Sequence, residues 1–258
     1  MDIDRRTFAT SLLGGTVAMC AAPQAAAEVM PSPGRADNVV LVHGLFADGS
    51  SWSRVIPLLQ ARGLNVTSVQ NPLTTLDEAV AACRKVLDRQ AGPTVLAGHS
   101  FSGMIVTEAG VHPSVSAIAY IAARAPDAGE DYAALAARFP APPASAGIIY
   151  DGDEGRLSEQ AFLRDFAGDL PPGEARIFHA VQQPFRKALL AGRTTQAAWR
   201  TKPSFYAVSS EDRTINPDLQ RFMASRMKAR TATLRSSHVS LLSHPREVAA
   251  LILEASGR

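Results

Sequence analysis

The stretch "TVLAGHSFSG", residues 94–103, joins an apolar run to a short segment of glycine, histidine and serine. Residues 94–98 indicate a buried strand, and the apolar residues that follow Gly103 indicate a helix. Small residues on both sides of Ser100 let a strand and a helix approach closely at a tight turn. The arrangement is typical of a nucleophile elbow, with Ser100 at the turn. Ser102 stands where the G-x-S-x-G pattern has glycine, so we expect slight strain there.

Strand and helix patterns alternate through much of the chain. Thr75 and Glu78 form a predicted capping box at the start of one helical pattern. Several of the strand-like runs are apolar without alternation, as in parallel strands covered on both faces. The sequence therefore predicts an α/β fold with a doubly wound, mostly parallel sheet. The six predicted strands cover residues 38–42, 65–70, 93–98, 115–122, 203–210 and 231–236.

One interval breaks this alternation. Residues 127–199 are rich in Ala, Pro and Gly and carry amphipathic pieces at 158–166 and 183–192. An insertion of this size between two strands of an α/β sheet is expected to cover the carboxyl ends of the strands. We therefore predict a single domain over residues 28–258, with a helical cap insertion at about 127–199.

The first residues differ from the rest of the chain. Arg5 and Arg6 precede an apolar, small-residue run over 12–22, and three alanines end at Ala27. This pattern predicts a cleaved export signal over residues 1–27, of the twin-arginine type, with an ordinary Sec signal as the alternative. An uncleaved membrane anchor is a further alternative, although the apolar run is short for a bilayer. The mature chain would begin near Glu28 in the periplasm.

Charge and cysteine content limit the classes of partner. The chain has 26 Lys and Arg against 24 Asp and Glu, and no basic run. The electrostatic footprint of a nucleic-acid binder is therefore missing, and a small neutral or weakly polar molecule is the expected partner. Cleavage near Ala27 would remove Cys20 and leave Cys83, which cannot form an internal disulfide alone. The sequence leaves the oligomeric state open.

A serine nucleophile needs a histidine base, and the base needs an orienting carboxylate. Asp212 follows the predicted strand at 203–210, and His238 follows the last predicted strand. The chain order is then Ser100, Asp212 and His238, which we predict to be the catalytic residues. Glu211 and Asp127 remain alternative carboxylates.

The tetrahedral intermediate of such a reaction needs hydrogen-bond donors for its negative charge. The backbone N–H groups of Phe101 and Leu45 are the predicted oxyanion hole, because Phe101 follows the nucleophile and Leu45 lies after the first strand. Gly44 allows the chain to turn tightly there. Gly44, Phe46 and Val239 are the predicted substrate-binding residues, with Leu45, Phe101 and parts of the cap completing an apolar lining.

None of the other histidines is predicted to act as the catalytic base. His43 is expected to pack beneath the oxyanion loop, and His99 to point away from the site. His112 and His244 precede prolines and are expected in a loop or at a helix start. His179 lies in the cap and is a candidate for substrate contact. No cluster of His, Cys and Asp has metal-ligand spacing, so we predict no metal.

Four blocks of this sequence resemble the α/β-hydrolase superfamily, in the branch of small carboxylesterases, plant methylesterases and hydroxynitrile lyases. They are "LVHGLFADGSSW", "AGHSFSG", "SSEDRTINPDLQRFMASRM" and "SSHVSLLSHPREV". They belong to the predicted sheet at 38–126 and 203–256 and leave out the cap. The resemblance implies a cofactor-free serine hydrolase that cleaves a small carboxylic ester or related acyl compound through an acyl-enzyme.

Other functions are compatible with the same scaffold. A cofactor-free perhydrolase, or haloperoxidase, would use the same triad with peroxide as acyl acceptor, and a non-catalytic binding protein would use none of it. Ser100 excludes the relatives that have aspartate at the elbow. In the plant lyases of this branch, a threonine and a lysine stand where this sequence has Gly44 and Val239. These two differences favour an esterase over a lyase.

Overall fold

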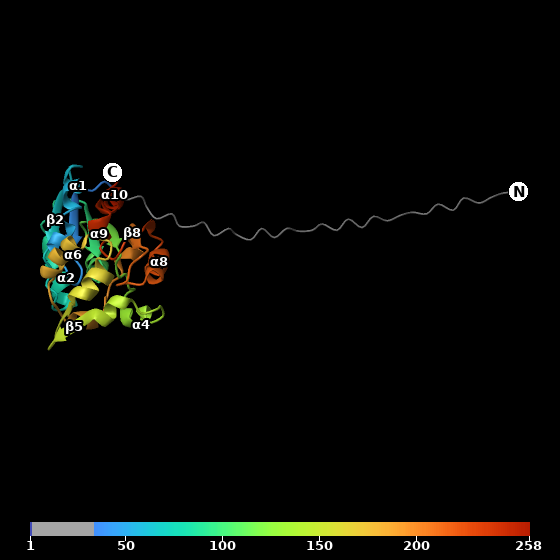
Figure 1. The fold of residues 1–258 in the computed structure, drawn as a ribbon. Coiled ribbons are helices and arrows are strands. Elements are labelled where there is room, and N and C mark those ends of the chain that lie inside the picture. The colour runs from blue at the N-terminus through green and yellow to red at the C-terminus, as the bar shows by residue number, and fades with distance from the viewer. Residues whose placement is uncertain (2–33) are drawn as a thin grey trace. The chain divides into compact units, whose positions relative to one another are not determined.

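The structure, a computed structural model, describes Met1 and residues 34–258 (Figure 1). The predicted export signal and its cleavage site lie in residues 2–33, outside the described residues. Six strands form one sheet in the order β2-β1-β3-β4-β8-β9, and every neighbouring pair is parallel. All six predicted strands are confirmed, each within two residues at its ends. They are β1 (Asn38–Val42), β2 (Asn65–Val69), β3 (Thr94–His99), β4 (Val115–Ile121), β8 (Ser204–Ser209) and β9 (Arg230–Leu234).

The position of each strand in the sheet explains its composition. Every residue of β1, β3 and β8 is buried, and β4 has one half-buried residue, Ser116. The edge strands β2 and β9 expose part of their residues. Central strands covered on both faces need apolar side chains on both, which is why their sequences do not alternate.

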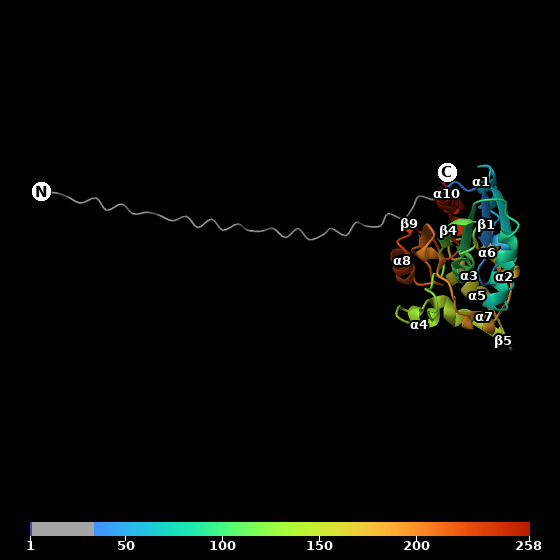
Figure 2. The ribbon, with the colours of Figure 1, turned by 180° about the vertical axis from the view of Figure 1, so that it is seen from behind.

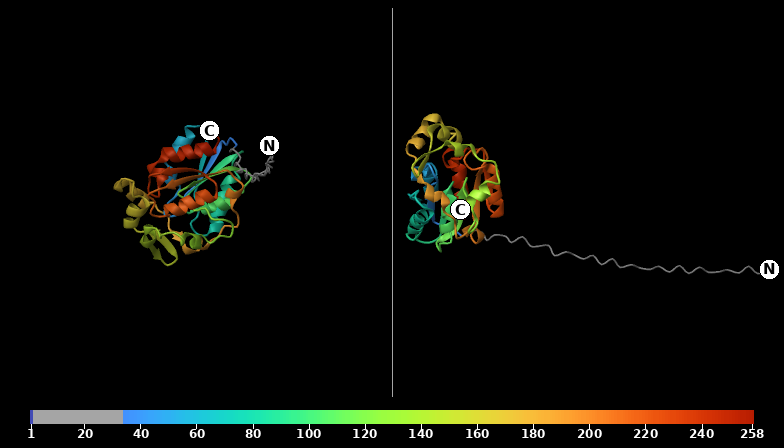
Figure 3. Two further views of the ribbon diagram at one scale, coloured as in Figure 1. Left: turned by 90° about the vertical axis from the view of Figure 1, so that its right-hand side faces the viewer. Right: turned by 90° about the horizontal axis from the view of Figure 1, so that it is seen from below.

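Helices cover both faces of the sheet (Figure 3). On one face α10 (Pro245–Ala255) packs on β4 and β8 and contacts α1 (Ile56–Gln60). On the other lie α2 (Leu76–Leu87), α3 (Ser102–Ala109) and α8 (Pro217–Arg226). Helix α2 begins at the predicted cap, because the Glu78 N–H donates to Thr75 Oγ1 at 3.2 Å. The doubly wound α/β fold is confirmed. None of the described helices is long and apolar enough to cross a membrane.

The chain between β4 and β8 forms an insertion, with its elements α4, β5 and α7 at the end of the molecule opposite α10 and the C-terminus (Figure 1, Figure 2). Its helical segments bear out the helical part of the prediction. They are α4 (Tyr132–Ala136), η2 (Pro143–Gly147), α5 (Glu159–Ala161), the π-helical turn η3 (Phe162–Phe166), α6 (Pro172–Ala180), α7 (Lys187–Ala191) and η4 (Ala198–Arg200).

The insertion also contains a small sheet that the sequence analysis did not predict. Strands β5 (Ile148–Asp151), β6 (Glu154–Leu157) and β7 (Phe185–Arg186) pair antiparallel in that order. The hairpin turns at Gly152, where φ is 59°. The central residues of this turn are Gly152 and Asp153, because Asp151 pairs with Glu154. Glycine at the first central position of a two-residue turn is a hairpin signal, because that position has positive φ. The surrounding Ala, Pro and Gly content obscured it.

Candidate active site

Ser100 lies at a sharp turn between β3 and α3. Its φ is 60°, a left-handed conformation that is uncommon for a residue with a side chain. Its carbonyl accepts hydrogen bonds from the N–H groups of Gly103 (3.1 Å) and Arg124 (2.9 Å), which hold the turn. A Cβ on Gly103 would lie 1.8 Å from the Arg124 carbonyl oxygen. The elbow therefore needs its glycine at position 103, where the backbone of the neighbouring loop touches it.

Ser102 causes no visible strain, contrary to the prediction. The side chain is fully buried, and its Oγ lies 2.7 Å from the Val42 carbonyl and 2.8 Å from that of His99. Its φ is not positive. The hydroxyl thus connects the start of α3 to the ends of β1 and β3, and its own need for a hydrogen-bond partner is met.

Three predicted residues meet at the carboxyl edge of the sheet. His238 Nε2 lies 2.7 Å from Ser100 Oγ, and His238 Nδ1 lies 2.6 Å from Asp212 Oδ2. Each follows a different parallel strand, so the topology brings their loops to one edge. The side chains of His238 and Asp212 are fully buried, and Ser100 is 5 % exposed. The geometry is that of a nucleophile, a base and an orienting acid.

The carboxylate of Asp212 is held by three further donors. Its Oδ1 accepts from the N–H groups of Thr214 (2.7 Å) and Ile215 (3.0 Å), and its Oδ2 accepts from Gln220 Nε2 (2.6 Å). Gln220 is fully buried on α8, and the sequence analysis missed it. A polar residue on the inward face of a predicted amphipathic helix was the available signal.

Neither alternative carboxylate lies against His238. Asp127 accepts from Arg200 Nε at 2.8 Å, and that arginine lowers the pKa of the carboxyl. Glu211 accepts from Arg235 Nε at 2.7 Å on the surface. Both acids are engaged in ion pairs of their own.

The predicted oxyanion donors lie beside Ser100. A Cβ on Gly44 would be 2.6 Å from Ser100 Cβ, so the loop after β1 touches the serine directly. Among residues 34–258, the backbone N–H groups of Leu45 and Phe101 have no hydrogen-bond acceptor. Two free N–H groups on the loops that flank a buried serine can receive an oxyanion.

Two histidines other than His238 are buried near the site. His43 lies beneath the oxyanion loop as predicted, with Nδ1 3.0 Å from the Gly44 carbonyl, and burial lowers its pKa. The prediction for His99 is wrong. Its ring centroid lies 4.8 Å from that of His238, and its Nε2–H donates to the His238 carbonyl at 3.0 Å. Burial and the neighbouring His238 keep the pKa of His99 well below its usual value, so it supports His238 as a neutral ring.

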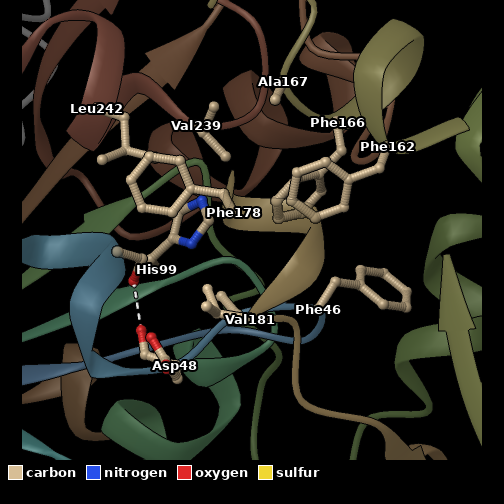
Figure 4. Close-up of a pocket in the computed structure, with 12 residues that line it drawn as sticks. Phe46, Asp48, His99, Phe162, Phe166, Ala167, Phe178, Val181, Val239 and Leu242 are labelled. Carbon is tan, nitrogen blue, oxygen red and sulfur yellow. Dashed lines mark hydrogen bonds between the residues drawn. The ribbon is translucent and has the colours of Figure 1, made fainter. Parts of the chain in front are cut away.

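Two pockets share Phe46 as a lining residue. The first is aromatic and narrow, and His99, Phe166 and Phe178 all border it (Figure 4). Its volume of about 330 Å³ includes space open to solvent, and about 10 Å³ is free to the centre of a water-sized molecule. The second, of about 470 Å³ including the space open to solvent, contains Ser100. The first is lined by Phe46, Ala47, Asp48, Ser51, His99, Phe162, Phe166, Ala167, Phe178, Val181, Val239 and Leu242. The second is lined by Leu45, Phe46, Ser100, Arg124, Ala144, Ser145, Ile148, Leu190, Thr214 and Ile215.

Comparison with known proteins identifies the chain's family. Residues 39–251 match the alpha/beta hydrolase family. The chain belongs to this family. It is 24% identical over 247 residues to a pyrethroid hydrolase of Sphingobium wenxiniae, covering 84% of this chain and 86% of that protein.

Solved structures of this hydrolase fold are similar throughout. Polyneuridine aldehyde esterase superposes with a TM-score of 0.72 at 19% identity, covering 85% of this chain and 99% of that one. A methylesterase from Arabidopsis superposes with a TM-score of 0.71 at 18% identity, covering 86% and 99%.

The pocket lining of this alpha/beta hydrolase differs in part from the prediction. Phe46 and Val239 line a pocket as predicted, and Leu45 lines the one with Ser100. Phe101 does not, because its fully buried ring lies under the Arg124 guanidinium, 5.1 Å from the ring centroid. Gly44 contacts Ser100 and borders neither pocket.

His179, the histidine predicted in the insertion, lies away from both pockets. His179 on α6 packs edge-on against Phe162, with 5.5 Å between ring centroids, and lines neither pocket. No local sequence pattern identifies Arg124 or Phe166, because their places in the site depend on contacts between distant segments. Within the described part of this hydrolase, no three His, Cys, Asp or Glu side chains gather as a metal site.

Proposed function

We propose that this chain is a serine hydrolase that cleaves small carboxylic esters through an acyl-enzyme. The observation that carries the proposal is the pair of hydrogen bonds of 2.7 Å and 2.6 Å that links Ser100 to His238 and His238 to Asp212 at a nucleophile elbow. Relatives named as an esterase, a methylesterase and a pyrethroid hydrolase support ester cleavage.

In this reaction Ser100 Oγ attacks the ester carbonyl carbon while His238 Nε2 takes the hydroxyl proton. Asp212 holds the Nδ1–H of His238 and stabilises the imidazolium that forms. The N–H groups of Leu45 and Phe101 receive the oxyanion, each such donor being worth about 3 kcal/mol. His238 then donates its proton to the leaving alcohol. Water attacks the acyl-Ser100 with His238 as base, and the acid leaves as His238 returns the proton to Ser100 Oγ.

The two pockets suit the two halves of an ester. The space at Ser100 would receive the reacting carbonyl and one substituent. The narrow aromatic pocket, which Phe46 also borders, would receive an apolar group if its side chains move apart. Such a division agrees with a substrate that is larger than an acetate ester.

The same site is poorly suited to cyanohydrin cleavage. A side chain at position 44 would collide with Ser100, since its Cβ would lie 2.6 Å from Ser100 Cβ. Val239 borders the aromatic pocket and supplies no charge for a departing cyanide. Backbone donors and an apolar lining favour an acyl transfer instead.

The proposal is tested with p-nitrophenyl esters of increasing size, measured as kcat/KM. Ser100→Ala should abolish hydrolysis and retain the thermal melting temperature, because truncating one hydroxyl costs little stability. Ser145→Ala is the matched control, since Ser145 borders the same pocket and should remain active. A fluorophosphonate should label Ser100 alone, as mapped by mass spectrometry.

Labelling at another residue, or an active Ser100→Ala variant, would contradict the assignment. Adding hydrogen peroxide to the assay and measuring peracid distinguishes a perhydrolase from an esterase. Peracid formation faster than ester hydrolysis would favour the perhydrolase.

A further inference from the structure

Arg124 brings a positive charge to the pocket that contains Ser100. It lies three residues after the end of β4, and its N–H donates to the Ser100 carbonyl at 2.9 Å. Its side chain lines that pocket together with Leu45 and Phe46. The hydrogen bond to Ser100 therefore fixes the backbone of Arg124 beside the nucleophile elbow.

The guanidinium is held by aromatic rings. Its Cζ lies 4.5 Å from the ring centroid of Tyr132 and 5.1 Å from that of Phe101. These contacts fix the plane of the group, as cation–π contacts do. One polar contact is formed, from Nη1 to Met104 Sδ at 3.9 Å, and sulfur is a weak acceptor.

No carboxylate among residues 34–258 pairs with Arg124, although acids lie nearby in the chain. Asp127 pairs with Arg200, and Glu130 pairs with Arg226 at 2.8 Å. The Nε of Arg124 is buried without a hydrogen-bond acceptor in the described structure. Burial lowers the pKa of the group, but an arginine stays protonated at neutral pH. The result is a half-buried cation without a carboxylate partner among the described residues, bordering the pocket that contains Ser100.

We propose that Arg124 binds a carboxylate of the substrate, so that the preferred substrates are esters that also carry a negative charge. This inference rests on the proposed ester hydrolysis at Ser100 and names its substrate class. A guanidinium offers several N–H donors in a planar fork that matches a carboxylate. Partial burial of a cation without an anionic partner is unfavourable, and a bound carboxylate reduces that cost.

The experiment compares charged and neutral esters of matched size. The acyl series pairs the p-nitrophenyl monoesters of succinate, glutarate and adipate with p-nitrophenyl butyrate, valerate and hexanoate. The alcohol series pairs 4-acetoxybenzoate with methyl 4-acetoxybenzoate, which places the charge on the leaving group. The ratio of kcat/KM for the charged and neutral members is measured for the wild type and for three variants.

Arg124→Met removes the charge and keeps a long side chain, and Arg124→Lys keeps the charge without the planar fork. Arg200→Met is the matched control, because Arg200 is an exposed arginine paired with Asp127. We expect the wild type to favour a charged ester in at least one series by about tenfold, mainly through KM, as for a hydrogen bond to a charged group. Arg124→Met should lose this preference while hydrolysing neutral esters, Arg124→Lys should keep part of it, and Arg200→Met all of it.

A wild type without preference in both series, or an Arg124→Met variant that keeps the preference, overturns the proposal. If Arg124→Met does not fold, Arg124→Lys decides, and an unchanged charged-to-neutral ratio overturns the role of Arg124. The proposed function is tested separately, by comparing the wild type and Ser100→Ala on the neutral esters. The loss of the charge preference alone therefore leaves ester hydrolysis standing.

Discussion

The carboxyl group of Asp212 accepts four hydrogen bonds, from His238 Nδ1, Gln220 Nε2 and the N–H groups of Thr214 and Ile215. Four donors fix both oxygens, so the group has one orientation toward His238. The Gln220 amide is fixed in turn, because its Oε1 accepts from the Ser209 N–H at 3.0 Å. A residue placed by so many bonds can orient a base with little motion.

We predict that Asp212→Asn lowers kcat by about 10⁴ with little change in KM, because the amide favours the wrong tautomer of His238. The measurement is steady-state kinetics with p-nitrophenyl butyrate. Asp127→Asn is the control and should stay near wild type, because Asp127 pairs with Arg200 away from His238. A near-normal Asp212→Asn together with an inactive Asp127→Asn would reverse the assignment of the acid.

The junction of β3 and α3 depends on two close approaches. A Cβ on Gly98 would lie 2.9 Å from Val106 side-chain atoms, and one on Gly103 would lie 1.8 Å from the Arg124 carbonyl oxygen. The first neighbour is a buried β-branched side chain, with the Ser102 carbonyl oxygen at 3.0 Å, and the second is backbone at a much shorter distance. Ser102 lies between them with its hydroxyl hydrogen-bonded to backbone. The element therefore tolerates serine at 102 and requires glycine at 103.

We predict that Gly103→Ala lowers the free energy of unfolding by about 3 kcal/mol, because the new methyl group displaces the Arg124 backbone. Ser102→Ala, the control at the next position, should lose about 1 kcal/mol with its hydrogen bond. Urea denaturation followed by circular dichroism measures both. Equal losses for the two variants would show that the contact at position 103 is easily relieved.

Much of the molecule is predictable from local sequence, and the rest depends on contacts between distant segments. Apolar runs identify the six strands because burial on both faces shapes each run alone. The meeting of Ser100, Asp212 and His238 is predictable, because each follows a parallel strand and parallel strands bring their carboxyl ends to one edge of the sheet. The contact of His99 with His238 joins residues 139 apart, and no local pattern contains it. That Arg124 has no carboxylate partner among residues 34–258 is likewise visible only in the structure, where the nearby acids pair with other arginines.

The insertion completes the site from outside the sheet. Phe162, Phe166 and Phe178 border the aromatic pocket from the insertion, whereas His99 ends strand β3 and Val239 follows β9 (Figure 4). The Asp165 carboxylate also accepts from Arg213 Nε at 2.7 Å, which ties the insertion to the loop that carries Asp212. The insertion and the sheet, which are separate in sequence, should therefore together determine which substrate sizes fit.

Helix α6 offers a direct test of this arrangement, because neighbouring residues on it differ in environment. Phe178 borders the aromatic pocket, and Ile177 is 64% exposed. We predict that Phe178→Ser lowers kcat/KM for p-nitrophenyl phenylacetate about tenfold, since it removes apolar contact with a large substituent. Hydrolysis of p-nitrophenyl acetate should change little, because an acetyl group is small enough to stay in the pocket that contains Ser100. Ile177→Ser should leave both esters unaffected, and an equal loss on both esters in Phe178→Ser would mean that α6 supports the fold and does not select the substrate.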